Sequence, residues 1–368
     1  MTNKLRINIL TYNPSFGGGD RVVAIYARKL KDMGHDVHII ALKPPAPPIA
    51  HRIKRFMRTG KFIKNSFSTE RFSNAGLCVR VVEGKQAIEN CDVPDGDILI
   101  ATFWLTAEWA INLSAQKGAK TYLIQGYEAA FPYAPAARVR ATYTAPFSKI
   151  AVSNWLNEML RENVQTEAFA VIPNSVDHDQ FYAPPRNKNQ RPSIGFLYST
   201  SENKGVDVTM RAVQLMRDTI PDLKTIAFST HHPTRKLPLP DGCEFYHRPA
   251  QDKIRNIYAK CDLWLSASRM EGFNLTLLEA MACRTPVIAT RAGAAPDLID
   301  DGVEGYVTPI DDYAALAHKA ASVLQSSDDK WRRMSDAAYE KAISYSWDDA
   351  AALFEKALLE IAAAEKHT

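Results

Sequence analysis

SASRMEGFNLTLLEAMACRTPV, residues 266–287, is the stretch that decides how this chain folds. It follows a short apolar run that begins near Leu263, and an apolar helical pattern begins near Asn274. Gly272 lies in the turn between them, and asparagine is a residue type that can cap a helix. The stretch predicts a strand, a turn and a helix whose first amide groups attract phosphate or sugar oxygens beyond the strand's carboxyl end.

Two carboxylates flank the start of the predicted helix. Glu271 precedes the helix and would project from the loop toward a bound sugar. Glu279 shares a helix face with Thr276, three residues earlier, so its carboxylate could reach a pair of ribose hydroxyls. These positions would let the two carboxylates contact a bound sugar and a ribose.

Apolar runs of strand length alternate with helical patterns along the rest of the chain. We predict strands at 6–11, 37–42, 98–102, 122–125 and 150–152, then at 193–197, 225–228, 244–247 and 263–267. The helical patterns include about 20–33 and 347–361. This alternation predicts two parallel, doubly wound sheets: an N-terminal domain over 1–172, a Pro-containing linker over 173–192 and a C-terminal domain over 193–345. A final helix covers 346–368, and the family resemblance given below implies that it crosses back to the first domain.

Composition narrows the function classes. A length of 368 residues favours two domains, and 46% apolar with 23% charged residues is typical of a folded globular protein. Residues 1–172 carry 22 Lys+Arg against 14 Asp+Glu, whereas the remainder carries 23 against 27, so the basic character belongs to the first part. Basic residues do not alternate with aromatic ones along the chain, so no nucleic-acid partner is predicted. Five scattered cysteines indicate a cytoplasmic protein without a zinc site.

Residues 51–68 combine six basic residues with interleaved Ile, Met and Phe. A helix there would have one basic and one apolar face, as helices bound at a membrane surface do. Two interpretations stay open. The segment either holds the protein at the anionic inner face of a membrane, as a peripheral protein, or packs its apolar side on its own domain.

Six motifs occur in a fixed order along nearly the whole chain: GGGDRV at 17–22, GHDV at 34–37, VIPNSVD at 171–177, EGFNLTLLEAMA at 271–282, TPVIAT at 285–290 and GYVTP at 305–309. They resemble the motifs of retaining family 4 glycosyltransferases, and residues 125–128 are similar to a variant found in enzymes that build bacterial surface polysaccharides. The resemblance implies the GT-B fold, two Rossmann-like domains facing across a cleft. It also implies transfer of a sugar from a nucleotide-diphosphate sugar to a glycan or lipid-linked acceptor, without a metal or another cofactor.

The resemblance assigns roles to individual residues. Glu271 and Lys204 would be catalytic, and Lys204 would neutralise the leaving diphosphate, where negative charge develops. Glu279 would bind the ribose hydroxyls. Backbone amides of the turn and the first helical residues would contact the transferred sugar and the diphosphate: Gly272, Phe273, Asn274, Leu275 and Thr276.

The chain departs from the family pattern at Ser199, where an arginine usually precedes the lysine by five residues. Arg269 and Arg248 follow matched strands and are candidates to supply the missing positive charge at the donor site. Without a second cation, we expect weaker affinity for the diphosphate or a different donor.

The acceptor would lie against the first domain. The resemblance places Gly17, Gly18 and Gly19 there, together with Gln125 and Glu128 of the QGYE stretch. For Glu128 a purely structural hydrogen bond is an equally open interpretation. The Asp95–Asp97 stretch DGD has the spacing of a metal-binding motif, but it precedes a strand and reads as a turn, so no metal site is predicted.

Two alternatives to sugar transfer stay open. A protein of the same fold could act as an epimerase or hydrolase of nucleotide sugars, which would consume the donor without an acceptor. A catalytically weak protein could instead serve as a binding scaffold. Retention of the two glutamates and Lys204 favours transfer, whereas Ser199 favours the scaffold.

Overall fold

The computed structural model describes residues 4–15, 17–45 and 67–365. The chain divides into two compact units. Unit 1 comprises residues 1–151, 159–172 and 351–368, and unit 2 comprises residues 152–158 and 173–350. Residues 51–66 of the predicted amphipathic segment 51–68 lie outside the described residues.

Unit 1 is built on a seven-stranded parallel sheet with the order β3-β2-β1-β4-β5-β6-β7. Its strands are β1 (Arg6–Tyr12), β2 (Asp36–Leu42), β3 (Val79–Val82), β4 (Ile98–Ala101), β5 (Ala119–Ile124), β6 (Ser148–Ala151) and β7 (Ala170–Val171). Its helices are α1 (Gly18–Asp32), α3 (Glu70–Asn74), α4 (Trp104–Asn112) and α5 (Ala136–Thr144), with the 3-10 turn η3 (Glu128–Ala130) before α5. The next helix, α6 (Asn154–Val164), begins in unit 2 and ends in unit 1.

Unit 2 is built on a six-stranded parallel sheet with the order β10-β9-β8-β11-β12-β13. Its strands are β8 (Ser193–Leu197), β9 (Lys224–Ser229), β10 (Glu244–His247), β11 (Leu263–Ser266), β12 (Val287–Thr290) and β13 (Gly305–Thr308). Its helices are α7 (Val206–Thr219), α8 (Ile254–Ala259), α9 (Leu275–Ala282), α10 (Ala295–Leu298), α11 (Tyr313–Leu324) and α12 (Asp328–Ile343), with the 3-10 turn η4 (Glu202–Lys204) before α7.

Both strand orders reverse once, between β1 and β4 in unit 1 and between β8 and β11 in unit 2. The order of unit 2 is that of a Rossmann sheet, and open sheets of this kind bind ligands beyond the carboxyl ends of the strands where the order reverses. The two predicted doubly wound sheets are confirmed, and each unit has its own position for a site.

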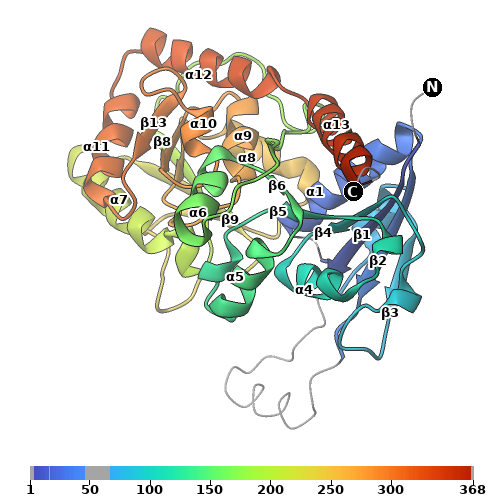
Figure 1. The fold of residues 1–368 in the computed structure, drawn as a ribbon. Coiled ribbons are helices and arrows are strands. Elements are labelled where there is room, and N and C mark those ends of the chain that lie inside the picture. Colours follow the sequence, from blue (N-terminus) through green and yellow to red (C-terminus); the bar gives the residue numbers. More distant parts are fainter. Residues whose placement is uncertain (1–3, 16, 46–66, 366–368) are drawn as a thin grey trace. The chain divides into compact units, whose positions relative to one another are not determined.

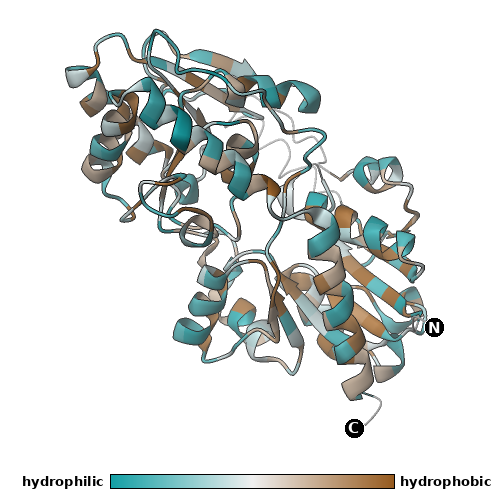
Figure 2. Ribbon diagram, turned by 90° about the horizontal axis from the view of Figure 1, so that it is seen from above, coloured by the Kyte–Doolittle hydropathy of each residue, from teal (hydrophilic) through white to brown (hydrophobic). Residues whose placement is uncertain are grey.

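The inner strands β1, β4, β8, β9, β11 and β12 are largely apolar and buried, and Figure 2 shows brown along the sheets against the teal of many helical residues. Parallel strands covered on both faces need such continuous apolar runs. The final helix, α13 (Trp347–Glu365), belongs to unit 1 from residue 351 onward and lies beside α1 (Figure 1). There the rings of Tyr26 and Phe354 lie 4.4 Å apart, and His35 Nε2 lies 2.8 Å from Glu355 Oε1.

The stretch 173–192, which we expected to be a linker, is part of unit 2. Two of its residues bind the buried carboxylate of Asp262, which accepts hydrogen bonds from the backbone amide of Asn189 (2.8 Å) and from the guanidinium of Arg186 (3.5 Å). The guanidinium of Arg186 packs over the ring of Trp331 at 4.7 Å. Polar residues and proline suggested a linker, because these long-range contacts leave no local signal in the sequence.

Two further differences concern secondary structure. Strands β3, β7, β12 and β13 were not among the strands predicted from apolar runs. Helix α1 begins at Gly18, two residues before the predicted start. Among the described residues, no helix is both long and apolar enough to cross a membrane.

Candidate active site

Unit 2 places Lys204 and Glu271 on neighbouring loops, one after β8 and the other after β11. The carbonyl of Asn203 accepts hydrogen bonds from the backbone amides of Arg269 (2.8 Å) and Met270 (3.3 Å). The main chain therefore fixes the two loops to each other at the point where the strand order reverses.

Gly205 makes this close approach possible. Its φ is +57°, in the left-handed region that glycine adopts without strain. A Cβ atom at this position would lie 1.8 Å from the carbonyl oxygen of Ala267 at the end of β11. Glycine is thus required here both for its backbone conformation and for the space it leaves.

Lys204 and Glu271 form an ion pair, with Nζ 2.7 and 2.9 Å from the two carboxylate oxygens. The hydroxyl of Ser268 donates to Oε1 of Glu271 at 2.7 Å. The side chain of Glu271 is 10% exposed and that of Lys204 is 33% exposed, so the ammonium is the more accessible partner. The pair is neutral as a whole, and an anionic group that approaches the accessible ammonium would share it with Glu271.

Asn274 stands at the N-terminus of α9, as predicted, but it does not cap the helix through its side chain. Its φ is +80°, which turns the amide toward the end of β11. Its Nδ2 donates to Ser266 Oγ at 2.8 Å, and its Oδ1 accepts from Thr276 Oγ1 at 2.7 Å. The first amide groups of α9 are therefore not occupied by Asn274 and keep their capacity to bind an anion.

Glu279 lies one turn into α9 and is 6% exposed. The hydroxyl of Tyr258, on α8, donates to its Oε2 at 2.8 Å. This bond holds the carboxylate in one orientation. A tyrosine on the apolar face of a helix gives no sign in the sequence of the partner that its hydroxyl will find.

Four of the predicted donor-side residues line one small cavity of about 10 Å3, roughly the space of one water molecule. They are Lys204, Glu271, Asn274 and Thr276. Ser268 joins them and was not predicted, because a serine in a turn carries no distinguishing signal. The remaining predicted residues of the turn lie beside this group: Phe273 is buried, and the carbonyl of Gly272 accepts a hydrogen bond from Ser153 Oγ at 2.7 Å.

The two arginines considered as substitutes at Ser199 differ in their surroundings. Arg269 is bound to two carboxylates, with 2.6 Å to Asp207 and 2.6 Å to Asp311, and these raise its pKa. Its charge is therefore already neutralised by protein groups. Arg248 is exposed and donates through Nε to the carbonyl of Thr230 at 3.0 Å, with no carboxylate partner among the described residues.

Unit 1 gathers its predicted residues at the carboxyl ends of β1, β4 and β5. A pocket of about 650 Å3 opens there, which we call the unit 1 pocket. Gly19, Gln125 and Glu128 line it, whereas Gly17 and Gly18 lie at the start of α1 outside the lining. A Cβ on Gly19 would lie 3.6 Å from the Gln125 side chain, so the glycine loop and the QGYE stretch pack together.

Glu128 is the most perturbed carboxyl of this pocket. It is 3% exposed, and its Oε2 accepts from the backbone amide of Trp104 (2.7 Å) and the hydroxyl of Tyr122 (2.8 Å). Burial raises the pKa of Glu128 to about 8, although these two bonds act in the opposite direction. No described residue hydrogen-bonds to Oε1. The hydrogen bonds from Trp104 and Tyr122 therefore both use Oε2, so Oε1 can bond to a ligand in the pocket.

Family models match both halves of the chain. One described as "Glycosyltransferase Family 4" matches residues 16–180, and one described as "Glycosyl transferases group 1" matches residues 178–341. The chain belongs to glycosyltransferase family 4. The predicted resemblance is confirmed, and the matches together span residues 16–341.

Relatives of this glycosyltransferase agree with that assignment. N-acetyl-alpha-D-glucosaminyl L-malate synthase of Bacillus anthracis is 40% identical over 78 residues, 21% of this chain and 20% of the relative. The aligned parts span between 11% and 55% of the length of the curated relatives compared. Sucrose-phosphate synthase from Thermosynechococcus elongatus has a TM-score of 0.72 at 18% identity, covering 98% of this chain and 100% of that one. Anabaena HepE, solved in complex with UDP-glucose, has a TM-score of 0.70 at 16% identity over 99% and 100%. The GT-B fold is thereby confirmed.

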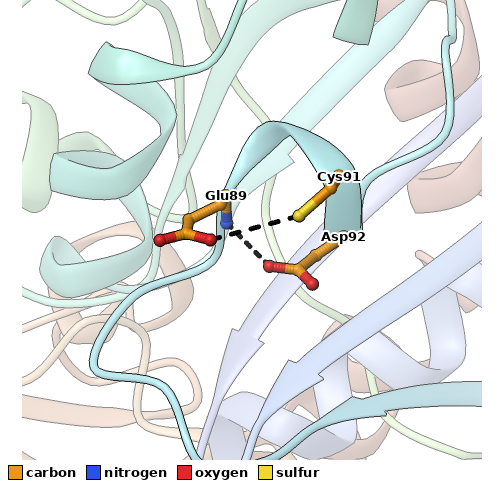
Figure 3. Close-up of side chains that lie close together, drawn as sticks. All are labelled: Glu89, Cys91 and Asp92. Carbon is orange, nitrogen blue, oxygen red and sulfur yellow. Dashed lines mark hydrogen bonds between the residues drawn. The ribbon is translucent and has the colours of Figure 1, made fainter.

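The described part of this glycosyltransferase contains one cluster with the composition of a metal site, formed by Glu89, Cys91 and Asp92 (Figure 3). The ammonium of Lys85 lies 2.7 Å from the Glu89 carboxylate, 2.9 Å from that of Asp92 and 3.4 Å from the Cys91 sulfur. A lysine therefore already takes the position of a cation in this cluster.

The DGD stretch is also structural in this glycosyltransferase. The carboxylate of Asp97 accepts from the backbone amide of Arg6 at 2.8 Å, and that of Asp95 pairs with Lys117 at 2.8 Å. The stretch lies before β4, at the amino ends of the strands, and so far from the edge that carries the unit 1 pocket. Both carboxylates therefore bind protein groups at the amino ends of the strands.

Changing Glu128 to glutamine is expected to make stability less dependent on pH. Because the raised pKa favours the protonated form in the folded chain, Glu128 stabilises it fully below pH 4.5, and this contribution is lost as the pH rises toward 8. Glutamine imitates the protonated carboxyl and does not ionise. We expect the melting temperature of Glu128→Gln to match wild type near pH 4.5 and to exceed it by about 5 °C or more at pH 9.

Calorimetric scans across pH 4.5–9 would measure the difference, with the exposed Glu162→Gln as the matched control. A constant offset between Glu128→Gln and wild type at every pH would contradict the prediction. It would mean that the carboxyl is ionised in the folded protein throughout this range.

Proposed function

We propose that this family 4 glycosyltransferase moves a sugar from a nucleotide-diphosphate sugar to a glycan or lipid-linked acceptor with retention of anomeric configuration. The observation that carries the proposal is the Lys204–Glu271 ion pair beside the N-terminus of α9, at the reversal point of unit 2. A diphosphate would share the Lys204 ammonium with Glu271 and accept hydrogen bonds from the first amides of α9.

The reaction would proceed without a protein nucleophile. The bond between the anomeric carbon and the diphosphate oxygen breaks, the acceptor hydroxyl bonds to the same face of that carbon, and its proton passes to the departing phosphate oxygen. Lys204 and the first amides of α9 would stabilise the negative charge that develops on the diphosphate. We propose that this charge compensation comes from protein groups, so that no metal or other cofactor is required.

Glu271 and Glu279 would orient the donor. The Glu271 carboxylate, held by Ser268, would accept hydrogen bonds from hydroxyls of the transferred sugar. Glu279, held by Tyr258, would do the same for the ribose. Arg248 is the better placed of the two arginines to add a second cation, because Arg269 is committed to Asp207 and Asp311.

A nucleotide-sugar donor is supported by HepE, which is solved with UDP-glucose, and by the family membership. The names of the relatives do not point to one acceptor, since one of them is named for L-malate and not for a polysaccharide. The QGYE stretch at the unit 1 pocket supports a role in making a bacterial surface polysaccharide, and we propose cytoplasmic transfer to a growing glycan or its lipid carrier.

Donor binding is the first prediction to test. Thermal stabilisation by UDP-, GDP-, dTDP- and ADP-sugars would be measured for wild type and for Glu279→Gln, because a ligand that binds the folded state raises the melting temperature. At 100 times its dissociation constant, one donor should stabilise wild type by about 2.7 kcal/mol. Glu279→Gln should lose most of that response, because a neutral amide accepts weaker hydrogen bonds from the two ribose hydroxyls than a carboxylate does.

Tyr258→Phe is the matched control, since it removes the hydroxyl that holds Glu279 but not the carboxylate itself. It should retain a reduced response. No stabilisation by any donor at millimolar concentration would overturn the proposal and favour the scaffold. Donor consumption at an undiminished rate without an acceptor would favour the epimerase or hydrolase.

A further inference from the structure

Helix α6 is preceded by a serine whose hydroxyl has two partners. Ser153 is 0% exposed, and its Oγ accepts a hydrogen bond from the backbone amide of Leu156 at 3.2 Å. This is the bond that an N-cap residue makes with its helix. The hydroxyl proton is donated elsewhere, to the carbonyl of Gly272 at 2.7 Å. The second bond therefore reaches the turn of the candidate active site, at the residue that directly follows Glu271.

The next carbonyl of the same turn is held by another element. The carbonyl of Phe273 accepts from the backbone amide of Ala294, just before α10, at 2.8 Å. The carboxylate of Asp297, on α10, accepts in turn from the backbone amide (3.1 Å) and the side-chain amide (3.2 Å) of Asn154, the first residue of α6. The turn, α10 and the start of α6 thus form a closed set of hydrogen bonds, all of it within unit 2.

The bond from Ser153 also fixes the direction of an amide. The Gly272 carbonyl and the Phe273 N–H belong to one planar peptide unit, in which they point in opposite directions. The Phe273 N–H is therefore directed away from Ser153. No residue that the structure describes accepts a hydrogen bond from this amide, although Phe273 is only 4% exposed. A buried amide without a protein acceptor is costly unless a ligand or a water molecule takes its place.

We propose that Ser153 is a positioning residue of the donor site. By holding the Gly272 carbonyl, it aims the Phe273 amide at an oxygen of the transferred sugar, without touching the donor itself. The inference rests on the proposed function, in which this turn contacts that sugar. Lys204 and Glu279 would still bind the donor if the amide were misdirected. The loss is therefore expected in the rate of the reaction and not in donor affinity, since small errors of position slow a reaction strongly.

Kinetics of Ser153→Ala separate this role from the loss of a helix cap. Ser327→Ala is the matched control, because Ser327 caps α12 of the same unit by accepting from the backbone amide of Lys330. Both variants should lower the melting temperature by a similar amount, about 2–4 °C. With the donor that stabilises wild type, we expect kcat for nucleoside diphosphate release to fall at least about tenfold in Ser153→Ala, while KM stays within about threefold. Both constants of Ser327→Ala should stay within about twofold of wild type.

NMR of isotope-labelled phenylalanine amides tests the position of the amide without turnover. Phe273→Leu identifies the Phe273 resonance by its disappearance. Ser153→Ala should shift this resonance in the free protein and reduce its response to the donor by about half or more, because the peptide unit loses its partner. Ser153→Thr keeps the hydroxyl and should restore both the rate and the resonance.

An unchanged kcat of Ser153→Ala, or an equal fall in Ser153→Ala and Ser327→Ala, would overturn the proposal. So would a Phe273 resonance that does not depend on Ser153 in a chain that binds a donor. If no nucleotide sugar binds wild type while the resonance still shifts in Ser153→Ala, the proposed function fails, and with it the role of the amide. The hydrogen bond that orients the peptide unit would then stand on its own.

Discussion

Replacing Gly205 with alanine is expected to lower the free energy of unfolding of unit 2 by about 3 kcal/mol or more and to abolish sugar transfer. A left-handed backbone costs an alanine about 1 kcal/mol. The larger part comes from the Cβ atom, which would lie 1.8 Å from the carbonyl oxygen of Ala267, so that the loop or the strand end must move. Lys204 precedes this position directly and would move with the loop.

Gly242→Ala is a matched control, because Gly242 also belongs to unit 2 and has a φ of +68°, but a Cβ there meets nothing within 4 Å. It should cost only the backbone term, about 1 kcal/mol, and leave transfer intact. Urea melts and turnover of both variants would measure the difference. Equal losses would show that the contact with Ala267 has no role and that backbone conformation alone accounts for the effect.

Replacing Lys204 with methionine is expected to reduce turnover about 100- to 1000-fold. Methionine keeps much of the length of the side chain but removes the charge that would meet the leaving diphosphate. The measurement is the rate of nucleoside diphosphate release with the donor that stabilises wild type. Lys253→Met, at a lysine of the same unit with a 67% exposed side chain, should change this rate by less than about twofold.

The loss of Lys204 also leaves Glu271 without its ionic partner, which could lower stability by itself. The double variant Lys204→Met/Glu271→Gln separates the two effects, because it removes both charges of the pair. Its melting temperature should recover relative to the single variant, while turnover should stay low. Recovery of turnover in the double variant would show that Lys204 serves the stability of the loop and not the reaction.

Both sheets could be predicted from the sequence, because apolar runs of strand length and glycine-containing turns are local signals. The Lys204–Glu271 pair was named residue by residue, yet the ion pair between them was not foreseen, since 67 residues separate the partners. The capping role predicted for Asn274 is wrong for a related reason. A local preference of asparagine for helix starts was overridden by Ser266, eight residues earlier, which binds its amide.

The role of the Glu128 carboxyl could also not be predicted from the sequence. The QGYE stretch indicated either an acceptor contact or a structural bond, and the sequence could not decide between them. The structure gives the two carboxylate oxygens different surroundings, because Tyr122 and the Trp104 amide both approach Oε2. Burial of a carboxyl depends on what surrounds it in three dimensions, so its raised pKa carried no signal in the sequence.

The assignment of residues 351–365 to unit 1 constrains how this chain can be divided in the laboratory. A cut after Ile172 appears natural on a linear map, but the first fragment would lack the helix that covers Tyr26 and engages His35. The second fragment would lack residues 152–158, which belong with unit 2. Neither unit is one contiguous stretch of sequence. An isolated unit 1 would therefore need α13 rejoined to it through a new linker, as in a circular permutation.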